Sequence, residues 1–386
     1  MENILAQAKR VAEKAEVFMV SAEETPVQFE TNRLKHIQSK QSTGLALRIV
    51  RQGRIGYAST TELSNTQSLV DNAVETAQFG MPARFELPSS TSYPQIDVFD
   101  PAVKSTSIEK MIELGEKLIA VVRSHTPDIV CEAFVTKGTI SLRIINSQGG
   151  QANYKKSIFG LGIEGSLIRG TDMLFVGESQ SSCHPLTEPG EVAEVVLQQL
   201  ELAKNQALVP TKQLPVIFTP RGVASALIPS LMAAFNGKIV LEGASPIGNR
   251  LGQQVFDPKL WLWDDPTIAY CPDSRPCDDE GIPSQRTPLI EQGAVANFLY
   301  DLQTAALART RSTGNGSRNR GLPAPSPSAF IISPGDTTFD EMVNDIKEGL
   351  VIEQLMGAEQ GNILGGDFSG NVLLGYKVES GKIVGR

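Results

Sequence analysis

The order in which strands and helices are predicted is the feature that most limits what this chain can fold into. Apolar residues predict two strands, 45–50 and 55–58, on either side of the turn Arg51-Gln52-Gly53-Arg54, a pattern typical of a β-hairpin. A helical stripe follows directly over residues 62–78. Because the order continues as a mixture and does not alternate strictly, we predict an α+β fold with mixed helices and antiparallel sheets.

Shorter patterns make local predictions in the first half of the chain. Residues 17–20 and 27–29 are predicted as two short strands. Residues 131–135 and 140–145 flank Lys137-Gly138, which predicts a second hairpin.

Further local predictions fall in the second half. Residues 220–235 predict a helix that Pro229 must kink or split. Residues 238–241 are predicted as a strand. The apolar segments on either side of Glu291-Gln292-Gly293 predict a hairpin.

Two proline-containing stretches divide the chain. Residues 81–101 form a connector rich in proline and serine, and Pro210 and Pro215 mark the clearest domain boundary. The fold is therefore expected to begin with an α/β-type region and to end with a larger, β-rich C-terminal domain. The expected units are an N-terminal subdomain over 1–100, a middle subdomain over 101–212 and a C-terminal domain over 213–386.

Charge and apolar content limit the partners of the chain. The net charge is −8, which argues against sequence-independent binding to nucleic acid. The longest apolar runs are too short to span a bilayer, and the first residues lack the basic start and apolar core of a signal peptide. We therefore expect a cytoplasmic protein with no membrane partner, and the net charge argues against nucleic acid as a ligand.

Only three histidines are present to bind zinc or to activate a nucleophile. The three histidines, His36, His125 and His184, lie far apart and form no His-x-x-x-His or His-Glu-x-x-His arrangement. Cys183 beside His184 is the only adjacent cysteine–histidine pair, and neighbours in a strand point to opposite faces. We therefore expect no catalytic residue and no metal ligand in this chain.

Residues 278–321 contain the stretch that most resembles a site. Asp278, Asp279 and Glu280 precede a glycine, and a short predicted helix over 302–309 leads to a loop. The loop residues are Thr313, Gly314, Asn315 and Gly316, and the arginines around them are Arg309, Arg311, Arg318 and Arg320. Backbone N–H groups and guanidinium groups in such a loop can converge on an anion. We predict that the acids and the loop bind substrate or contact another subunit.

Each half of this stretch also has a simpler interpretation, which stays open here. The acids can cap the following hairpin and lie in water, in which case they matter for folding more than for chemistry. The loop can be a solvated linker. No Gly-Lys-Ser/Thr follows the loop, so no nucleotide is implied.

Several separated motifs resemble the PmbA/TldD family, whose members have been labelled modulators of DNA gyrase and are now viewed as peptidases. The resemblance is strongest between residues 216 and 385, where the motifs stand in the family's order. The motifs are Val216-Ile217-Phe218-Thr219-Pro220, Asp278-Asp279-Glu280-Gly281, Ser312-Thr313-Gly314-Asn315, Gly349-Leu350-Val351-Ile352, Gly366-Asp367-Phe368-Ser369, Gly375-Tyr376 and Gly381-Lys382-Ile383. The first half of the chain is compatible with the family but carries no motif as specific.

The resemblance also implies which of the family's two related subunits this chain is. One subunit carries His-Glu-x-x-x-His on a helix of its C-terminal domain, an arrangement that implies a zinc peptidase. The corresponding helix here, residues 220–235, contains no histidine, carboxylate or cysteine. The chain therefore resembles the PmbA, or TldE-like, subunit, which completes the peptidase without holding the metal.

The same resemblance implies the partners. Zinc is expected only in a TldD-like, metal-bearing partner, and the expected substrate is an unfolded or extended peptide that is degraded or matured. A homodimer in the absence of that partner is compatible with the resemblance. Family members usually continue beyond the position of Arg386, so we expect either a naturally short version or a chain that has lost its end.

Two other functions stay open. One is a standalone enzyme with a different chemistry, for which Cys183 and His184 are the available residues. The other is a regulatory or nucleic-acid-associated binding protein of the gyrase-modulator type, without peptidase activity. The negative net charge argues against the nucleic-acid version.

Overall fold

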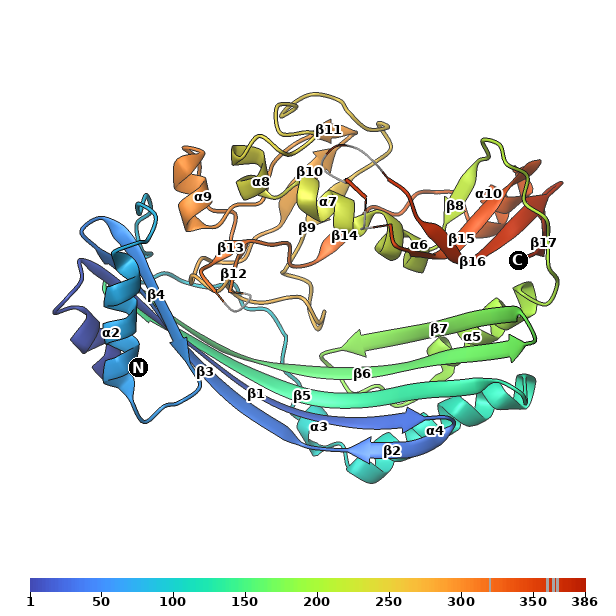
Figure 1. Ribbon diagram of the computed structural model, residues 1–386, viewed down its shortest axis with the longest axis horizontal. Coiled ribbons are helices and arrows are strands. Elements are labelled where there is room, and N and C mark those ends of the chain that lie inside the picture. Colours follow the sequence, from blue (N-terminus) through green and yellow to red (C-terminus); the bar gives the residue numbers. More distant parts are fainter. Residues whose placement is uncertain (319–320, 359–360, 363–364, 366–367) are drawn as a thin grey trace.

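A curved sheet of seven strands organises the first half of the chain (Figure 1). The computed structural model describes residues 1–318, 321–358, 361–362, 365 and 368–386. The strands follow the order β4-β3-β1-β5-β6-β7, with β2 paired to β1, and these pairs are antiparallel. The bounds are β1 Lys14–Glu30, β2 Arg33–Ile37, β3 Lys40–Arg51, β4 Arg54–Thr60, β5 Val130–Asn146, β6 Gln151–Arg169 and β7 Asp172–Ser182.

The strands of this sheet are longer than the local patterns predict. Residues 17–20 and 27–29, predicted as two strands, belong to the single strand β1. The predicted hairpin at Lys137-Gly138 is wrong, because β5 runs through both residues and pairs there with β1 and with β6. A Cβ on Gly138 would lie 3.0 Å from the carbonyl oxygen of Glu23, so this glycine allows close backbone approach and makes no turn.

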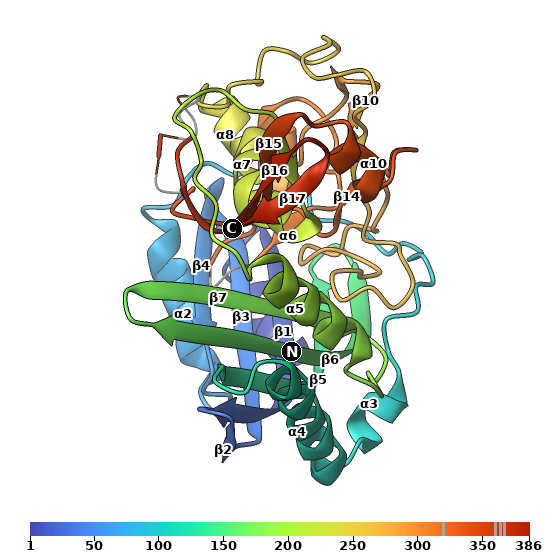
Figure 2. The same ribbon diagram turned by 90° about the vertical axis from the view of Figure 1, so that its right-hand side faces the viewer.

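Helices cover one face of the long sheet. Ala15 and Val17 of β1 pack in a core with residues of α1 and α2, and Val27 and Phe29, on the same face, pack with residues of α4 and α5. Figure 2 shows α5 between the long sheet and the C-terminal strands β15–β17. The bounds are α1 Glu2–Ala8, α2 Thr66–Ala77, α3 Pro101–Ser105, α4 Ile108–His125 and α5 Gly190–Leu202.

Much of the C-terminal half, including the segment around Cys277, lies over the opposite face of the long sheet (Figure 1). The strands β15 and β16 instead pack in the core that α4 and α5 cover. The C-terminal half contains the sheets β11-β10-β9-β14 and β17-β16-β15-β8 and the pair β12-β13, and β15 runs parallel to β8. The strands are β8 Val216–Phe218, β9 Leu262–Asp264, β10 Thr287–Glu291, β11 Ala294–Val295, β12 Gly316–Ser317, β13 Ala324–Pro325, β14 Phe330–Ile332, β15 Glu348–Met356, β16 Asn371–Glu379 and β17 Lys382–Gly385. The helices are α6 Pro220–Ala226, α7 Ile228–Ala234, α8 Gly237–Leu241, α9 Leu302–Leu307 and α10 Phe339–Asn344.

Local predictions in this half meet different outcomes. The helix over 220–235 is split next to Pro229 into α6 and α7, as predicted. The hairpin is also confirmed, because β10 pairs with β11 across a turn in which Gln292 and Gly293 have positive φ. The strand predicted at 238–241 is wrong. The Asn236 side chain accepts hydrogen bonds from the Lys238 and Ile239 N–H groups and so caps the start of helix α8.

The α+β class is confirmed, with antiparallel sheets dominating both halves. Residues 1–100 and 101–212 contribute strands to one sheet, since β1 pairs with β5 along its length. The division into three units stays a prediction. Within the part of the chain that the structure describes, no helix has both the length and the apolar character needed to cross a membrane.

Candidate functional site

The three adjacent acids lie in the interior of the protein. Asp278 and Glu280 have no exposed surface, with 0% accessibility each, and Asp279 is partly buried. The interpretation that places these acids in water is therefore wrong. One carboxylate oxygen of Asp278 accepts hydrogen bonds at 2.9 Å from the backbone N–H groups of Glu280 and Ile282, and Gly281 closes this turn with a positive φ.

The predicted loop lies directly against these acids. The Gly316 N–H donates to the second carboxylate oxygen of Asp278 at 2.8 Å, and the Asp279 N–H donates to the Gly316 carbonyl at 3.0 Å. A Cβ on Gly316 would lie 2.6 Å from a Glu280 carboxylate oxygen, so the acids leave no room for a side chain there. The loop does hold an anion, and that anion is the carboxylate of Asp278.

The other loop residues are also held by the protein. The Asn315 amide donates to the buried Asp264 carboxylate at 2.6 Å. The Thr313 hydroxyl accepts from the Tyr300 N–H at 2.8 Å, and Gly314 has a φ of +76°, which favours glycine. The structure thus brings all seven predicted site residues together. Their roles in substrate binding or subunit contact stay predictions.

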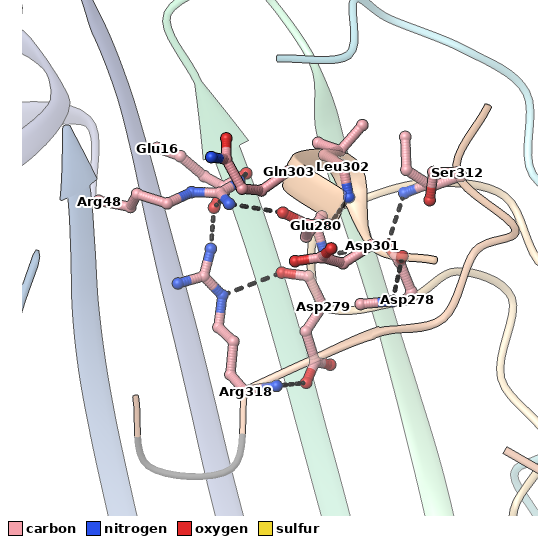
Figure 3. Close-up of polar contacts among 12 residues, drawn as sticks. Glu16, Arg48, Asp278, Asp279, Glu280, Asp301, Leu302, Gln303, Ser312 and Arg318 are labelled. Atoms are coloured by element: carbon pink, nitrogen blue, oxygen red, sulfur yellow. Dashed lines mark hydrogen bonds and ion pairs between the residues drawn. The ribbon is translucent and has the colours of Figure 1, made fainter. Parts of the chain in front are cut away.

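Two arginines join this cluster to the long sheet (Figure 3). Arg48 of β3 donates to Glu280 at 2.5 Å and to Glu16 of β1 at 3.1 Å. Arg318 donates to Glu16 and, through Nε, to the Asp279 carbonyl at 3.0 Å. We call Glu16, Arg48, Asp278, Asp279, Glu280 and Arg318 the Arg48–Arg318 network.

The arginines of the loop region do not act as one group. Arg318 has a side chain that is 3% exposed and pairs with Glu16, whereas Arg309 and Arg311 are exposed. Arg320 lies outside the described residues, as do Gly366 and Asp367 of one family motif.

Glu16 and Arg48 were not predicted as members of a site. A signal was present, because each charged residue stands between apolar residues in a strand that alternates toward a core. An ionised side chain in such a strand requires a partner on the opposite face. The sequence does not identify that partner, since Arg48 and Glu280 are 232 residues apart.

Burial and an excess of carboxylates set the ionisation of this cluster. Burial raises the pKa of Asp278, Glu280 and Asp301, and the neighbouring Asp278 and Asp301 charges raise that of Glu280 further. The Arg48 guanidinium opposes this effect at Glu280. Burial lowers the pKa of Arg318 to about 9. Because the buried acids are occupied by N–H donors and arginines, the arrangement is suited to joining segments, not to exchanging protons with solvent.

A second region of interest is a cleft of about 420 Å³ between α6 and the long sheet, which we call the α6 cleft. Its walls come from β5, β6 and β7 on one side and from α6 on the other. The lining residues are Phe134, Ile163, Glu164, Glu178, Ser179, Pro220, Arg221 and Ala224.

A zinc site does not fit the residues of α6 and α7. Zinc requires three or four imidazole, thiolate or carboxylate ligands, and residues 220–235 contain none of these groups. In the described part of the chain, no three His, Cys, Asp or Glu side chains are placed to share a metal.

Cys183 and His184 do not form a nucleophile–base pair. The His184 Nδ1 lies 2.7 Å from the Asp100 carboxylate, and its ring contacts the Tyr270 ring in a tilted arrangement. The buried Cys183 thiol is directed to the carbonyl oxygen of Cys271 at 3.5 Å, and burial raises its pKa. The two side chains have separate partners, so they offer no activated thiolate.

Comparison with known proteins identifies the family. Residues 211–386 match the PmbA/TldA metallopeptidase C-terminal domain and residues 15–77 match PmbA/TldA metallopeptidase domain 1. An uncharacterised protein of Methanocaldococcus jannaschii is 26% identical over 100% of this chain and 89% of its own length. Metalloprotease PmbA of Escherichia coli O157:H7 is 24% identical over 98% of this chain and 84% of its own length.

A solved structure shares the fold. The crystal structure of TldE from Thermococcus kodakarensis superposes with a TM-score of 0.88 at 21% identity, covering 100% of this chain and 89% of that one. The two family models together cover more than half of the chain. The resemblance predicted from the motifs is confirmed, and the chain belongs to the PmbA/TldD family of metallopeptidase-like proteins.

Proposed function

We propose that this chain is the accessory, TldE-like subunit of a two-subunit metallopeptidase that acts on unfolded peptides. A TldD-like partner supplies the catalytic zinc and its ligands. The partner's metal helix corresponds to α6 and α7 here, and this correspondence rests on the resemblance described above.

The observation that carries the proposal is the residue content of α6 and α7. Pro220, Arg221 and Ala224 of α6 line a cleft. Residues 220–235 contain no metal-ligating type, only small or apolar residues and one arginine, Arg221. A helix of this composition can form a wall of a binding cleft but cannot hold a metal ion. The chain therefore needs a second subunit for metal-dependent hydrolysis.

The comparisons support the choice of subunit type. Similarity to the E. coli protein named PmbA extends over 98% of this chain. The structure of TldE from Thermococcus kodakarensis superposes on 100% of this chain.

In this proposal the Arg48–Arg318 network has a positioning role. It ties β1 and β3 of the long sheet to the segments around Asp278 and Arg318 of the C-terminal half. The C-terminal half also carries α6, so a firm junction keeps α6 at a fixed distance from the sheet and preserves the cleft.

Mixing experiments test the proposal. The purified chain alone is expected not to cleave a fluorogenic unfolded peptide, and a His-Glu-x-x-x-His relative from the same organism is expected to cleave it strongly only after mixing with this chain. Chelator must abolish the gain, and a partner with Gln in place of the motif's Glu must show none. A chain that binds this relative without changing cleavage would indicate a regulatory protein instead.

A further inference from the structure

β7 is the outermost strand of the long sheet, and its outer edge is blocked at defined points. In an antiparallel pair, residues that bond the neighbouring strand alternate with residues whose N–H and C=O point away from it. Gly177 points away, because its N–H donates to the Gln199 side chain at 2.8 Å and its C=O accepts from the same amide at 3.2 Å. Gln199 of α5 thus takes the place of a neighbouring strand.

The same alternation assigns the rest of the edge. β6 and β7 pair without a bulge, so Ser179, Ser181 and Cys183 point outward together with Gly177. Two contacts agree with this assignment. The Ser179 N–H donates to the Glu178 carboxylate at 2.7 Å, and the Cys183 N–H donates to the Tyr270 carbonyl at 3.1 Å.

One part of the edge is not blocked. No hydrogen bond joins the Ser179 C=O, the Ser181 N–H or the Ser181 C=O to another residue in the described ranges. Both serines are exposed. Proteins usually cover or charge a free strand edge, because unpaired backbone groups recruit other chains. Here the blocks stand on either side of Ser181 and leave it open.

The open part of the edge adjoins the α6 cleft. Glu178 and Ser179 line the cleft, and Arg221 of α6 lies on the opposite side. The Phe134 side chain, 38% exposed, contributes an aromatic surface beside them. Figure 1 shows α6 above β7 in this region. A chain that entered the cleft would meet the free Ser179 C=O on one wall, and Ser181 is the next outward residue along the same edge.

We propose that the edge of β7 at Ser179 and Ser181 binds an extended peptide as an added strand. Main-chain hydrogen bonds of this kind need no particular sequence, which suits an unfolded substrate. The Glu164 and Glu178 carboxylates line the cleft and exceed its one cation, Arg221, so they favour a lysine or arginine side chain next to the strand. The inference rests on the proposed function for the peptide's role as substrate, but the binding is measurable on this chain alone.

The first test changes only the peptide. A fluorescein-labelled decapeptide of alternating threonine and lysine is titrated with the full chain, and fluorescence anisotropy reports binding. The matched probe carries an N-methyl group on every residue, so neither of its edges can donate the strand hydrogen bonds. We expect this methylated peptide to bind about tenfold more weakly, as the loss of one or two such bonds implies. Equal affinities, or no binding of the unmethylated peptide, would overturn the inference.

The second test changes only the protein. Ser181→Pro removes the outward N–H and leaves the β6–β7 bonds in place, whereas Ser181→Ala retains the N–H. Ser181→Pro is expected to weaken peptide binding about tenfold, and Ser181→Ala to leave it unchanged. Equal binding by the two folded variants would contradict the inference, and if Ser181→Pro does not fold, the methylated peptide decides. Peptide binding at β7 without any effect on a partner's cleavage would contradict the proposed function but would still support peptide binding by the strand edge.

Discussion

The Arg48–Arg318 network and the α6 cleft both bring together carboxylate and arginine side chains from distant parts of the chain, but these side chains differ in burial and in hydrogen bonding. In the network, Arg48 and Glu280 lie out of water and are bound to each other and to neighbouring groups. In the cleft, Glu164 is exposed, and Arg221 makes no ion pair within 4.0 Å among the described residues. A buried cluster whose carboxylates already accept hydrogen bonds joins segments, whereas a cluster with an exposed carboxylate can bind another molecule.

Removing one cation of the network is expected to have the largest effect. Arg48→Met keeps most of the side-chain volume but leaves the buried Glu16 and Glu280 carboxylates without their shared partner. Breaking a buried ion pair on one side typically lowers the free energy of unfolding by about 3–5 kcal/mol. Urea denaturation measures the change. Arg33→Met, at an exposed position of β2, is the matched control. Equal stability of the two variants would show that the network does not hold the halves together.

Filling the space between loop and acids is expected to have an intermediate effect. Gly316→Ala places a methyl group 2.6 Å from Glu280 and 3.0 Å from Asp278, so the loop must move and lose hydrogen bonds. Overpacking of this kind costs about 1–3 kcal/mol of stability. Gly335→Ala meets no atom within 4 Å and serves as the control in the same denaturation series. A Gly316→Ala protein as stable as this control would mean that the loop packs loosely.

The buried acids also predict a dependence of stability on pH. Burial raises the pKa of Asp278 to about 6 and that of Glu280 to about 8. A raised carboxyl pKa means that the folded state binds protons more tightly than the unfolded state. The stabilisation is therefore complete below the unfolded pKa, near about 4, and is lost as the pH rises through the raised values.

Thermal unfolding between pH 5 and pH 8 checks this dependence. The Tm of the unmodified chain is expected to fall across this interval, and Glu280→Gln, whose amide does not titrate, is expected to show a smaller fall. A Tm that falls equally in both proteins would assign the effect to other groups.

A change in the cleft is expected to have the smallest effect and to leave stability unchanged. Glu164 is exposed, so Glu164→Gln should alter the free energy of unfolding by less than about 0.5 kcal/mol. The variant is expected to bind the threonine–lysine peptide a few-fold more weakly, with a loss that shrinks as salt rises. A peptide with glutamine in place of lysine is the control and should not distinguish the variants. A large loss of stability would mean that Glu164, like the residues of the Arg48–Arg318 network, holds the fold together.

The comparison also explains what could be predicted from the sequence. The α+β class and the hairpin at Glu291-Gln292-Gly293 follow from apolar periodicity and turn residues within a few positions of each other. The sequence motifs identified the residues of the candidate site but not their burial. The burial depends on contacts such as Arg318 with Glu16, which are 302 residues apart and leave no local pattern. The hairpin prediction at Lys137-Gly138 was wrong for a related reason. A glycine that permits close contact with another strand has the same local pattern as one that makes a turn.

The central claim is that this chain contributes no metal site of its own to the peptidase. Metal analysis by mass spectrometry on the purified chain and on the assembled complex, with the subunits then separated, tests it most directly. We predict substoichiometric zinc in this chain, zinc in the TldD-like partner, and no peptide cleavage by this chain alone. One tightly bound zinc in this chain, with chelator-sensitive cleavage in the absence of any partner, would contradict the account.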